Sequence, residues 1–137
     1  MPYHRLLICM LVLLCATLPT ATCSKTEKRG ENLQTGLGLD PNTHTMSAPR
    51  AEFKAGEAFS LLLKPVQFRD TFVDLIIYSI DAGGNTHRSR SIAISVDTNE
   101  NFFQIVDAFQ IPFAGRFRIT FEQLGVRLGW ADVKIKD

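Results

Sequence analysis

From Arg50 to Asp137, short apolar runs alternate with polar turns, which is the pattern of an all-β domain. The turns "KAGE", "DAGGNT" and "QLG" supply the glycines that tight connections require. No apolar spacing typical of a helix is sustained over this region. The pattern predicts a single small antiparallel β-sandwich over residues 50–137, either immunoglobulin-like or jelly-roll in its connections. Its seven predicted strands lie around Phe53 and start near Ala58, Phe72, Arg88, Phe102, Arg116 and Val126.

The predicted strand "RFRITFE" separates its two faces most clearly. Phe117, Ile119 and Phe121 share one parity. Arg118 and Thr120 lie between them on the other parity. Because successive side chains of a strand point to opposite faces of the sheet, we expect the first set in the core and the second in water.

The last predicted strand breaks this alternation. Val126 and Leu128 share one parity. Val133 and Ile135 share the other, and Gly129 lies at the change. A phase shift at a glycine indicates a β-bulge, in which one residue of the strand is inserted without a partner.

The bulge leaves two orientations open for Trp130, the only tryptophan of the chain. In one register the indole belongs to the core, where large aromatic side chains are usually found. In the other it faces solvent together with Asp132 and Lys134, as a flat apolar platform beside a carboxylate that accepts hydrogen bonds. Trp130, Asp132 and Lys134 are therefore the candidate binding residues.

The first residues have the layout of an export signal. A short segment with one cation, residues 1–5, precedes thirteen uncharged residues from Leu6 to Leu18. This apolar segment is shorter than the roughly 20 residues that a membrane-spanning helix needs. Residues 1–22 are thus predicted to be a signal peptide.

The segment "TATC", from Thr20 to Cys23, resembles the lipobox of bacterial lipoproteins, in which a cysteine after small residues is diacylated and becomes the new N-terminus. The resemblance implies that Cys23 is lipidated and anchors the protein in a membrane of the cell envelope, on its periplasmic or cell-surface side. Two acyl chains give stable anchoring. The alternative is ordinary cleavage near Thr22 and a secreted chain, which would carry one unpaired thiol into an oxidising compartment.

Residues 23–49 differ in composition from the segments on either side. Gly, Thr, Asn, Ser and Pro dominate, mixed with charges of both signs. No strand or helix period is sustained over this length, so the segment is predicted to be a flexible tether between the anchor and the domain.

Charge excludes one class of partner. The chain has 15 Lys and Arg against 14 Asp and Glu, and loss of Arg5 with the signal leaves 14 of each. A formally neutral exported chain lacks the basic surface with which proteins bind nucleic acid, so no nucleic-acid partner is predicted.

The sequence contains no recognisable catalytic motif. His87 is the only histidine after residue 49, and no serine or acid is marked out by spacing as its partner. The protein is therefore predicted not to be an enzyme, and a small hydrolase is the least favoured function.

One loop resembles part of a cation site. "DTNEN" matches the first half of a calcium loop, but Phe102 stands where an EF-hand needs glycine. Asp97, Asn99 and Asn101 remain candidate calcium ligands between sandwich loops, and a polar turn is the alternative. No other cofactor is predicted.

A second resemblance covers residues 53–137. The succession "FKAGEAFSLLL", "DLIIYSIDAGG", "IPFAGRFRITF" and "GWADVKIKD" is similar to the strand pattern of galactose-binding-like jelly-roll carbohydrate-binding modules. It implies a non-catalytic domain that binds sugars. The leading hypothesis is a membrane-tethered extracytoplasmic binding module for a glycan or a protein. The alternative is a structural or assembly component of the cell envelope that has no small ligand.

Replacing Cys23 by alanine tests the anchor. Cys23→Ala is expected to release the exported protein from membranes, because no acyl chains can be attached. Fractionation of producing cells into membrane and soluble material measures the change. Identical fractionation of the variant and its parent, after complete export of both, would place the anchor elsewhere.

Overall fold

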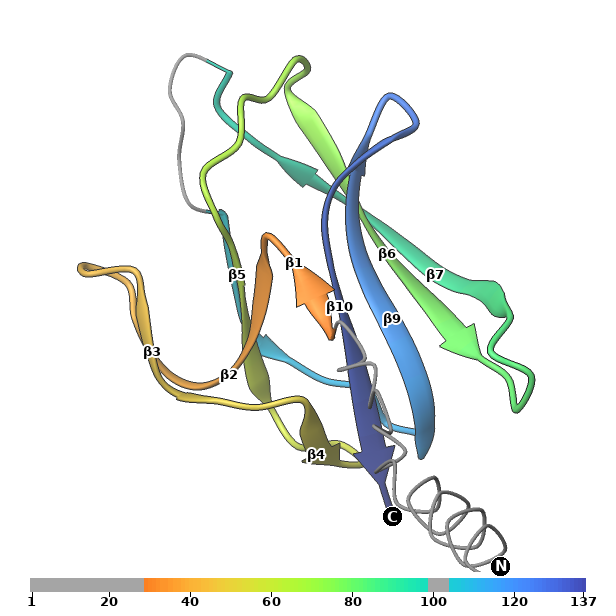
Figure 1. Cartoon of the computed structure of the whole chain (residues 1–137). Coiled ribbons are helices and arrows are strands. Elements are labelled where there is room, and N and C mark those ends of the chain that lie inside the picture. Colours follow the sequence, from red (N-terminus) through yellow and green to blue (C-terminus); the bar gives the residue numbers. More distant parts are fainter. Residues whose placement is uncertain (1–28, 99–103) are drawn as a thin grey trace, which may run out of the picture.

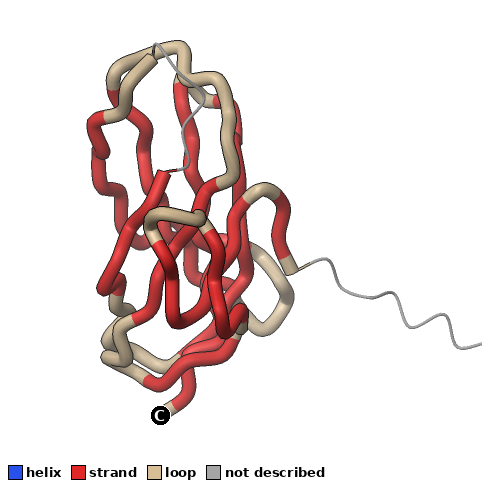
Figure 2. Tube along the Cα trace, turned by 90° about the vertical axis from the view of Figure 1, so that its left-hand side faces the viewer, coloured by secondary structure: helices blue, strands red, loops and turns tan. Residues whose placement is uncertain are grey.

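The computed structural model describes residues 29–98 and 104–137, which form two β-sheets packed face to face (Figure 1). The predicted β-sandwich is confirmed. The described residues form strands and loops without a helix (Figure 2). The six-stranded sheet contains β1 (Gly30–Glu31), β4 (Glu52–Lys54), β6 (Phe72–Ile80), β7 (Thr86–Ser95), β9 (Gly115–Gln123) and β10 (Val126–Lys136). The four-stranded sheet contains β2 (Leu33–Asp40), β3 (Thr45–Pro49), β5 (Phe59–Leu63) and β8 (Gln104–Phe109).

The order of strands corresponds to the immunoglobulin-like alternative. In one sheet β2, β5 and β8 are neighbours, and in the other β10, β9, β6 and β7 follow one another. These are the positions of strands A, B and E and of strands G, F, C and C′ in immunoglobulin-like sandwiches. Two short strands share the remaining edge of β10, where β1 pairs antiparallel and β4 pairs parallel.

The seven strands expected after residue 49 are present as β4 to β10. On β9 the predicted core face is also present, since Ile119 and Phe121 are buried and Phe117 packs against the core from a half-buried position. Apolar alternation was a reliable guide here because one face of β9 covers the other sheet.

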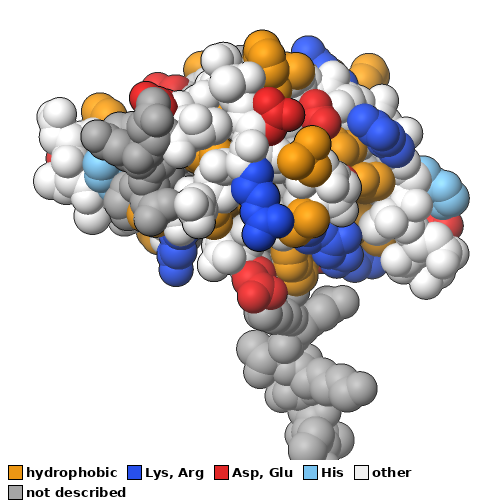
Figure 3. Space-filling view, turned by 90° about the horizontal axis from the view of Figure 1, so that it is seen from above, with side chains coloured by type: hydrophobic (Ala, Val, Ile, Leu, Met, Phe, Trp, Pro, Cys, Tyr) orange, Lys and Arg blue, Asp and Glu red, His pale blue; other side chains and the backbone are white. Residues whose placement is uncertain are grey.

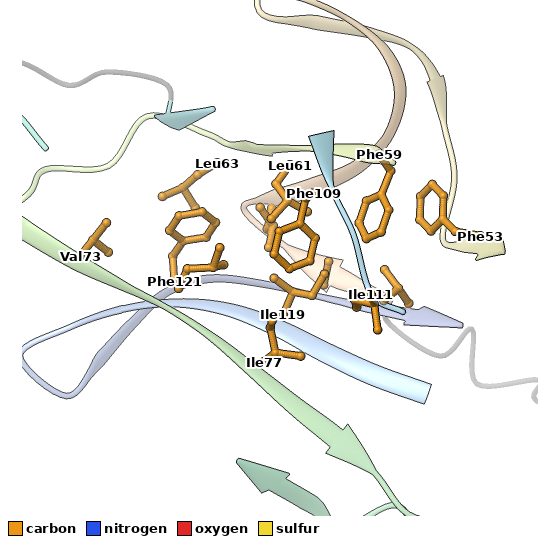
Figure 4. Packing of buried hydrophobic residues seen from close by; sticks show 14 of the residues in the cluster. Phe53, Phe59, Leu61, Leu63, Val73, Ile77, Phe109, Ile111, Ile119 and Phe121 are labelled. Atoms are coloured by element: carbon orange, nitrogen blue, oxygen red, sulfur yellow. The ribbon is translucent and has the colours of Figure 1, made fainter. Parts of the chain in front are cut away.

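The core lies between the two sheets (Figure 4). Phe59 occupies one part of it, with its ring stacked on Phe53 at 4.0 Å between centroids and edge-on to Phe109 at 5.4 Å. Leu61 and Leu63 follow Phe59 on β5. These side chains face Ile77, Ile119 and Phe121 of the opposite sheet (Figure 4). An edge-to-face pair such as Phe59 with Phe109 adds about 0.5–1.5 kcal/mol beyond the area that it buries.

The tether prediction is wrong for residues 30–49. This segment forms β1, β2 and β3, and β2 pairs antiparallel with β5 at the centre of the four-stranded sheet. Leu33 and Thr35 on β2 are buried. The glycines that suggested a flexible chain instead permit close packing, because a Cβ on Gly36 would lie 2.3 Å from the Sδ of Met46. Only residues 24–29 remain between Cys23 and the first strand.

One end of the sandwich is held together by a buried amide. The Gln123 side chain accepts a hydrogen bond from the Arg69 backbone N–H (2.6 Å) and donates to the carbonyls of Asp70 and Phe72 (2.8 and 2.7 Å). The β9–β10 turn lies at this end, with positive φ at Leu124 and Gly125. Figure 3 looks onto this end, where apolar and charged side chains are mixed. Its exposed apolar residues are Phe72, Leu124 and Val126.

A substitution on β2 tests whether residues 30–49 belong to the folded sandwich or form a tether. Leu33→Ala is expected to lower the free energy of unfolding by about 2–5 kcal/mol, because it leaves a cavity under the sheet. Leu124→Ala is the matched control, since Leu124 is 71% exposed against 7% for Leu33. Denaturant unfolding measures both. Equal free energies of unfolding for the two variants would show that Leu33 is not buried in the sandwich and would favour a tether over residues 30–49.

Candidate functional site

Trp130 faces solvent, because the predicted β-bulge is present. The register between β10 and β9 shifts between Arg127 and Gly129. After the shift, Ala131 and Val133 are buried and the intervening side chains point outward. The bulge needs a glycine, since a Cβ on Gly129 would lie 2.5 Å from the Leu63 Cδ1 and 3.2 Å from the Glu31 carbonyl oxygen. The outward alternative for Trp130 is therefore the one observed, with the indole half-buried.

The side chains around Trp130 form the surface that we call the outer face. It is the solvent side of β6, β9 and β10, and strand register arranges it in rows. One row joins Trp130, Thr120 and Ile76; the next joins Asp132, Arg118 and Tyr78; the third joins Lys134, Arg116 and Ile80. The three candidate residues thus lie on one face, and β9 and β6 place further polar and aromatic groups beside them.

Arg118 connects Trp130 with Asp132. Its Nε and Nη2 donate to Oδ1 and Oδ2 of Asp132 at 2.7 and 2.8 Å, a bidentate ion pair. Its guanidinium carbon lies 4.4 Å from the centroid of the indole ring, within cation–π range. The hydrogen bonds to Asp132 raise the pKa of the Arg118 guanidinium. Three side chains from two strands are thereby held in one arrangement.

This arrangement changes the role expected for Asp132. Its carboxylate was expected to accept hydrogen bonds from sugar hydroxyls, yet both oxygens accept from Arg118. The guanidinium also covers one face of the indole. Sequence reasoning placed Arg118 on the outward face but missed its contact with Trp130, because that contact depends on cross-strand register.

The outer face contains a second, small buried layer. Thr120 was expected in water, but its exposure is 0%, and Ile76 beside it is 3% exposed. The Thr120 hydroxyl lies 3.4 Å from the Ile76 carbonyl oxygen and from Oε1 of Glu122. The prediction of an exposed Thr120 is wrong. Thr120 lies between Trp130 on β10 and Ile76 on β6, and these two larger side chains exclude water from it.

Tyr78 is a further aromatic residue of the outer face. Its hydroxyl donates to Oε1 of Glu122 at 3.2 Å. Burial, followed by the negative charge of Glu122, raises the pKa of this phenol. The sequence contains a signal for this position of Tyr78: its parity on the strand is opposite to that of the buried Val73 and Ile77, which indicates an outward side chain.

His87 lies in an exposed ion pair at the β6–β7 hairpin. Its Nε2 is 3.0 Å from Oδ2 of Asp81. Hydrogen bonds from His87, and then from the backbone and side chain of Asn85, lower the pKa of the Asp81 carboxyl to about 2. The adjacent Ser79 hydroxyl donates to the His87 carbonyl and not to the imidazole. The hairpin thus lacks the serine–imidazole hydrogen bond that a hydrolytic triad uses.

The other candidate residues fall at or beyond the limits of the described chain. Asp97 is exposed, whereas Asn99 and Asn101 lie outside the described residues, as does Cys23. Within residues 29–98 and 104–137, no three His, Cys, Asp or Glu side chains group as metal ligands. In the same ranges, no helix is long and apolar enough to cross a membrane.

Removing Arg118 tests the stacking on Trp130. Arg118→Ala is expected to shift the tryptophan emission to the red and to increase its quenching by acrylamide, because the covered face of the indole becomes open to water. Arg116→Ala removes an equal charge from the next outward position of β9 and is expected to leave both unchanged. An unaltered spectrum in Arg118→Ala would show that the guanidinium does not cover the ring.

Comparison with known proteins does not assign the chain to a family. No family model matches the chain, and neither a curated protein nor a solved structure matches it.

Proposed function

We propose that this protein is an exported, membrane-tethered binding module that contacts a protein ligand through the outer face and catalyses no reaction. The observation that carries the proposal is the Trp130–Arg118–Asp132 arrangement on that face, with Tyr78 in the same row as Arg118. Trp, Tyr and Arg are the residue types that contribute most binding energy in protein interfaces.

The geometry favours preorganised recognition. Arg118 is held by two short hydrogen bonds and by the indole ring, so little side-chain freedom remains to be lost when a ligand binds. The outer face stands on strands of the sheet, which hold its residues more rigidly than loops would.

A protein ligand fits this surface better than a glycan. A sugar platform uses an open aromatic face and free hydrogen-bonding groups. Here the guanidinium of Arg118 covers one face of the Trp130 ring, and both oxygens of Asp132 are engaged. Aromatic side chains and arginine, which this surface combines, are enriched in protein interfaces.

The proposed anchor sets the position of the module. Between Cys23 and Gly30 the chain reaches at most about 25 Å when fully extended, at roughly 3.3–3.6 Å per residue. With Cys23 diacylated, the sandwich stays next to the membrane surface. The ligand would accordingly be another component of the envelope that is available there.

Photocrosslinking in intact membranes tests the function. A benzophenone side chain at Arg88, in register with Tyr78, is expected to give one discrete adduct. The same group at Ser47, exposed on β3 of the other sheet, is the control and is expected to give none. Equal adducts from the two positions, or no adduct from Arg88, would exclude the outer face and favour an envelope component that has no such ligand.

A further inference from the structure

A small pocket lies where β1 and β4 meet the same edge of β10. The backbone N–H of Asp132 donates to the Arg29 carbonyl at 2.9 Å, next to β1. Two residues further on, the Lys134 N–H donates to the Ala51 carbonyl at 2.8 Å, next to β4. The edge of β10 therefore changes partner within three residues. The pocket of about 160 Å³ lies at this change.

The pocket combines cations with apolar surface. Arg29, Arg116 and Lys134 contribute the cations, from three different segments of the chain. Val133 and Ile80 are among the apolar residues of its lining. Arg116 and Lys134 are register partners, which places them side by side on the outer face.

Two carboxylates also line the pocket, and both are already paired. Asp132 is bound by Arg118, and Glu52 forms an ion pair with Lys136; neither of these cations lines the pocket. The pKa of Glu52 is lowered first by its hydrogen bond with Lys136, and further by the charges of Lys136, Lys134 and Arg29.

The three pocket cations have no such partners. Within the described ranges, Arg29, Arg116 and Lys134 form no ion pair. They leave an excess of positive charge in a partly enclosed space, where charges are screened less than on open surface.

We propose that this pocket binds an oxyanion group, a carboxylate or a phosphate, carried by a ligand. Its volume of about 160 Å³ lies below the roughly 300–1,000 Å³ of sites that enclose a whole ligand, so the pocket suits one ionic group. Guanidinium and ammonium groups bind both oxyanions through charge-assisted hydrogen bonds. The inference goes beyond the proposed function, because a free anion binds here whether or not the outer face recognises a protein.

Anion titration followed by NMR tests the pocket. The exported chain, kept free of lipid by Cys23→Ala, is titrated with inorganic phosphate and separately with glucuronate, at constant ionic strength. Saturable shifts at Arg116 Nε and the Lys134 amide are expected with at least one anion. The anion that saturates identifies phosphate or carboxylate as the preferred group, and glucose is expected to cause no shift.

A double variant in the pocket and a matched double variant outside it distinguish specific anion binding from general electrostatic attraction. Arg116→Gln with Lys134→Gln is expected to weaken binding about tenfold or more, since two charged hydrogen-bond donors are lost. Arg69→Gln with Arg90→Gln removes the same charge from exposed positions outside the pocket and is expected to change affinity little. Unchanged Trp130 emission confirms the fold of each variant.

Two outcomes would overturn the proposal. One is non-saturating shifts with both anions, and the other is an equal loss of affinity in the variant and its control. Either outcome leaves the photocrosslinking at Arg88 unaffected. Conversely, saturable anion binding without that crosslink would reject the proposed function and keep the pocket.

Discussion

The register shift at Gly129 is the constraint on which the site depends. At the shift, Leu128 has no partner on β9 and packs against the core from a half-buried position; after it, Ala131, Val133 and Ile135 are buried in the core. A strand without the bulge would carry its second half in the opposite orientation, with Trp130 inside and three apolar residues in water. The shift therefore turns Ala131, Val133 and Ile135 toward the core while β10 presents an indole, a carboxylate and an ammonium group to solvent. A Cβ at position 129 would lie 2.5 Å from Cδ1 of Leu63 in the opposite sheet. Core packing therefore favours glycine at position 129, where the register shifts.

Sequence patterns predicted the strands that follow residue 49 and the core side of β9. The strands β4 to β10 have short apolar runs between polar turns, and the core side of β9 follows from simple alternation. The N-terminal strands lacked that signal. On β2, the alternating positions Leu33, Thr35 and Leu37 are separated by Gln34 and Gly36, and the composition resembles that of a linker. The strand forms because β5 offers a partner and buries Leu33, an effect of tertiary contact that local composition does not contain.

The candidate site was predictable in its residues but not in their chemistry. Gly129 revealed a phase shift and so identified Trp130, Asp132 and Lys134 as a set that shares one face. Their partners come from other strands, and pairing register decides which of them meet. Arg118 reaches both Trp130 and Asp132 because β9 runs antiparallel beside β10 in the register that sets Arg118 opposite Asp132. The carboxylate is therefore part of a fixed ion pair and not a free acceptor. Of the two ligand classes that the sequence left open, a glycan and a protein, we propose the protein.

The proposed anchoring and the proposed recognition involve the same strand, β10. The first described residues after the proposed lipid attachment are Arg29 and β1, which hydrogen-bond to β10 beside Trp130 and Asp132. Glu31 is the register partner of Trp130, and Arg29 lines the cationic pocket. A long tether would let the domain lie far from a membrane, whereas the six residues between Cys23 and β1 limit that distance. Under the proposed anchoring, the edge of the sheet that carries the site stays nearest the attachment point. A ligand in the same envelope layer then meets a surface whose position is already constrained, and less orientational freedom is lost on binding.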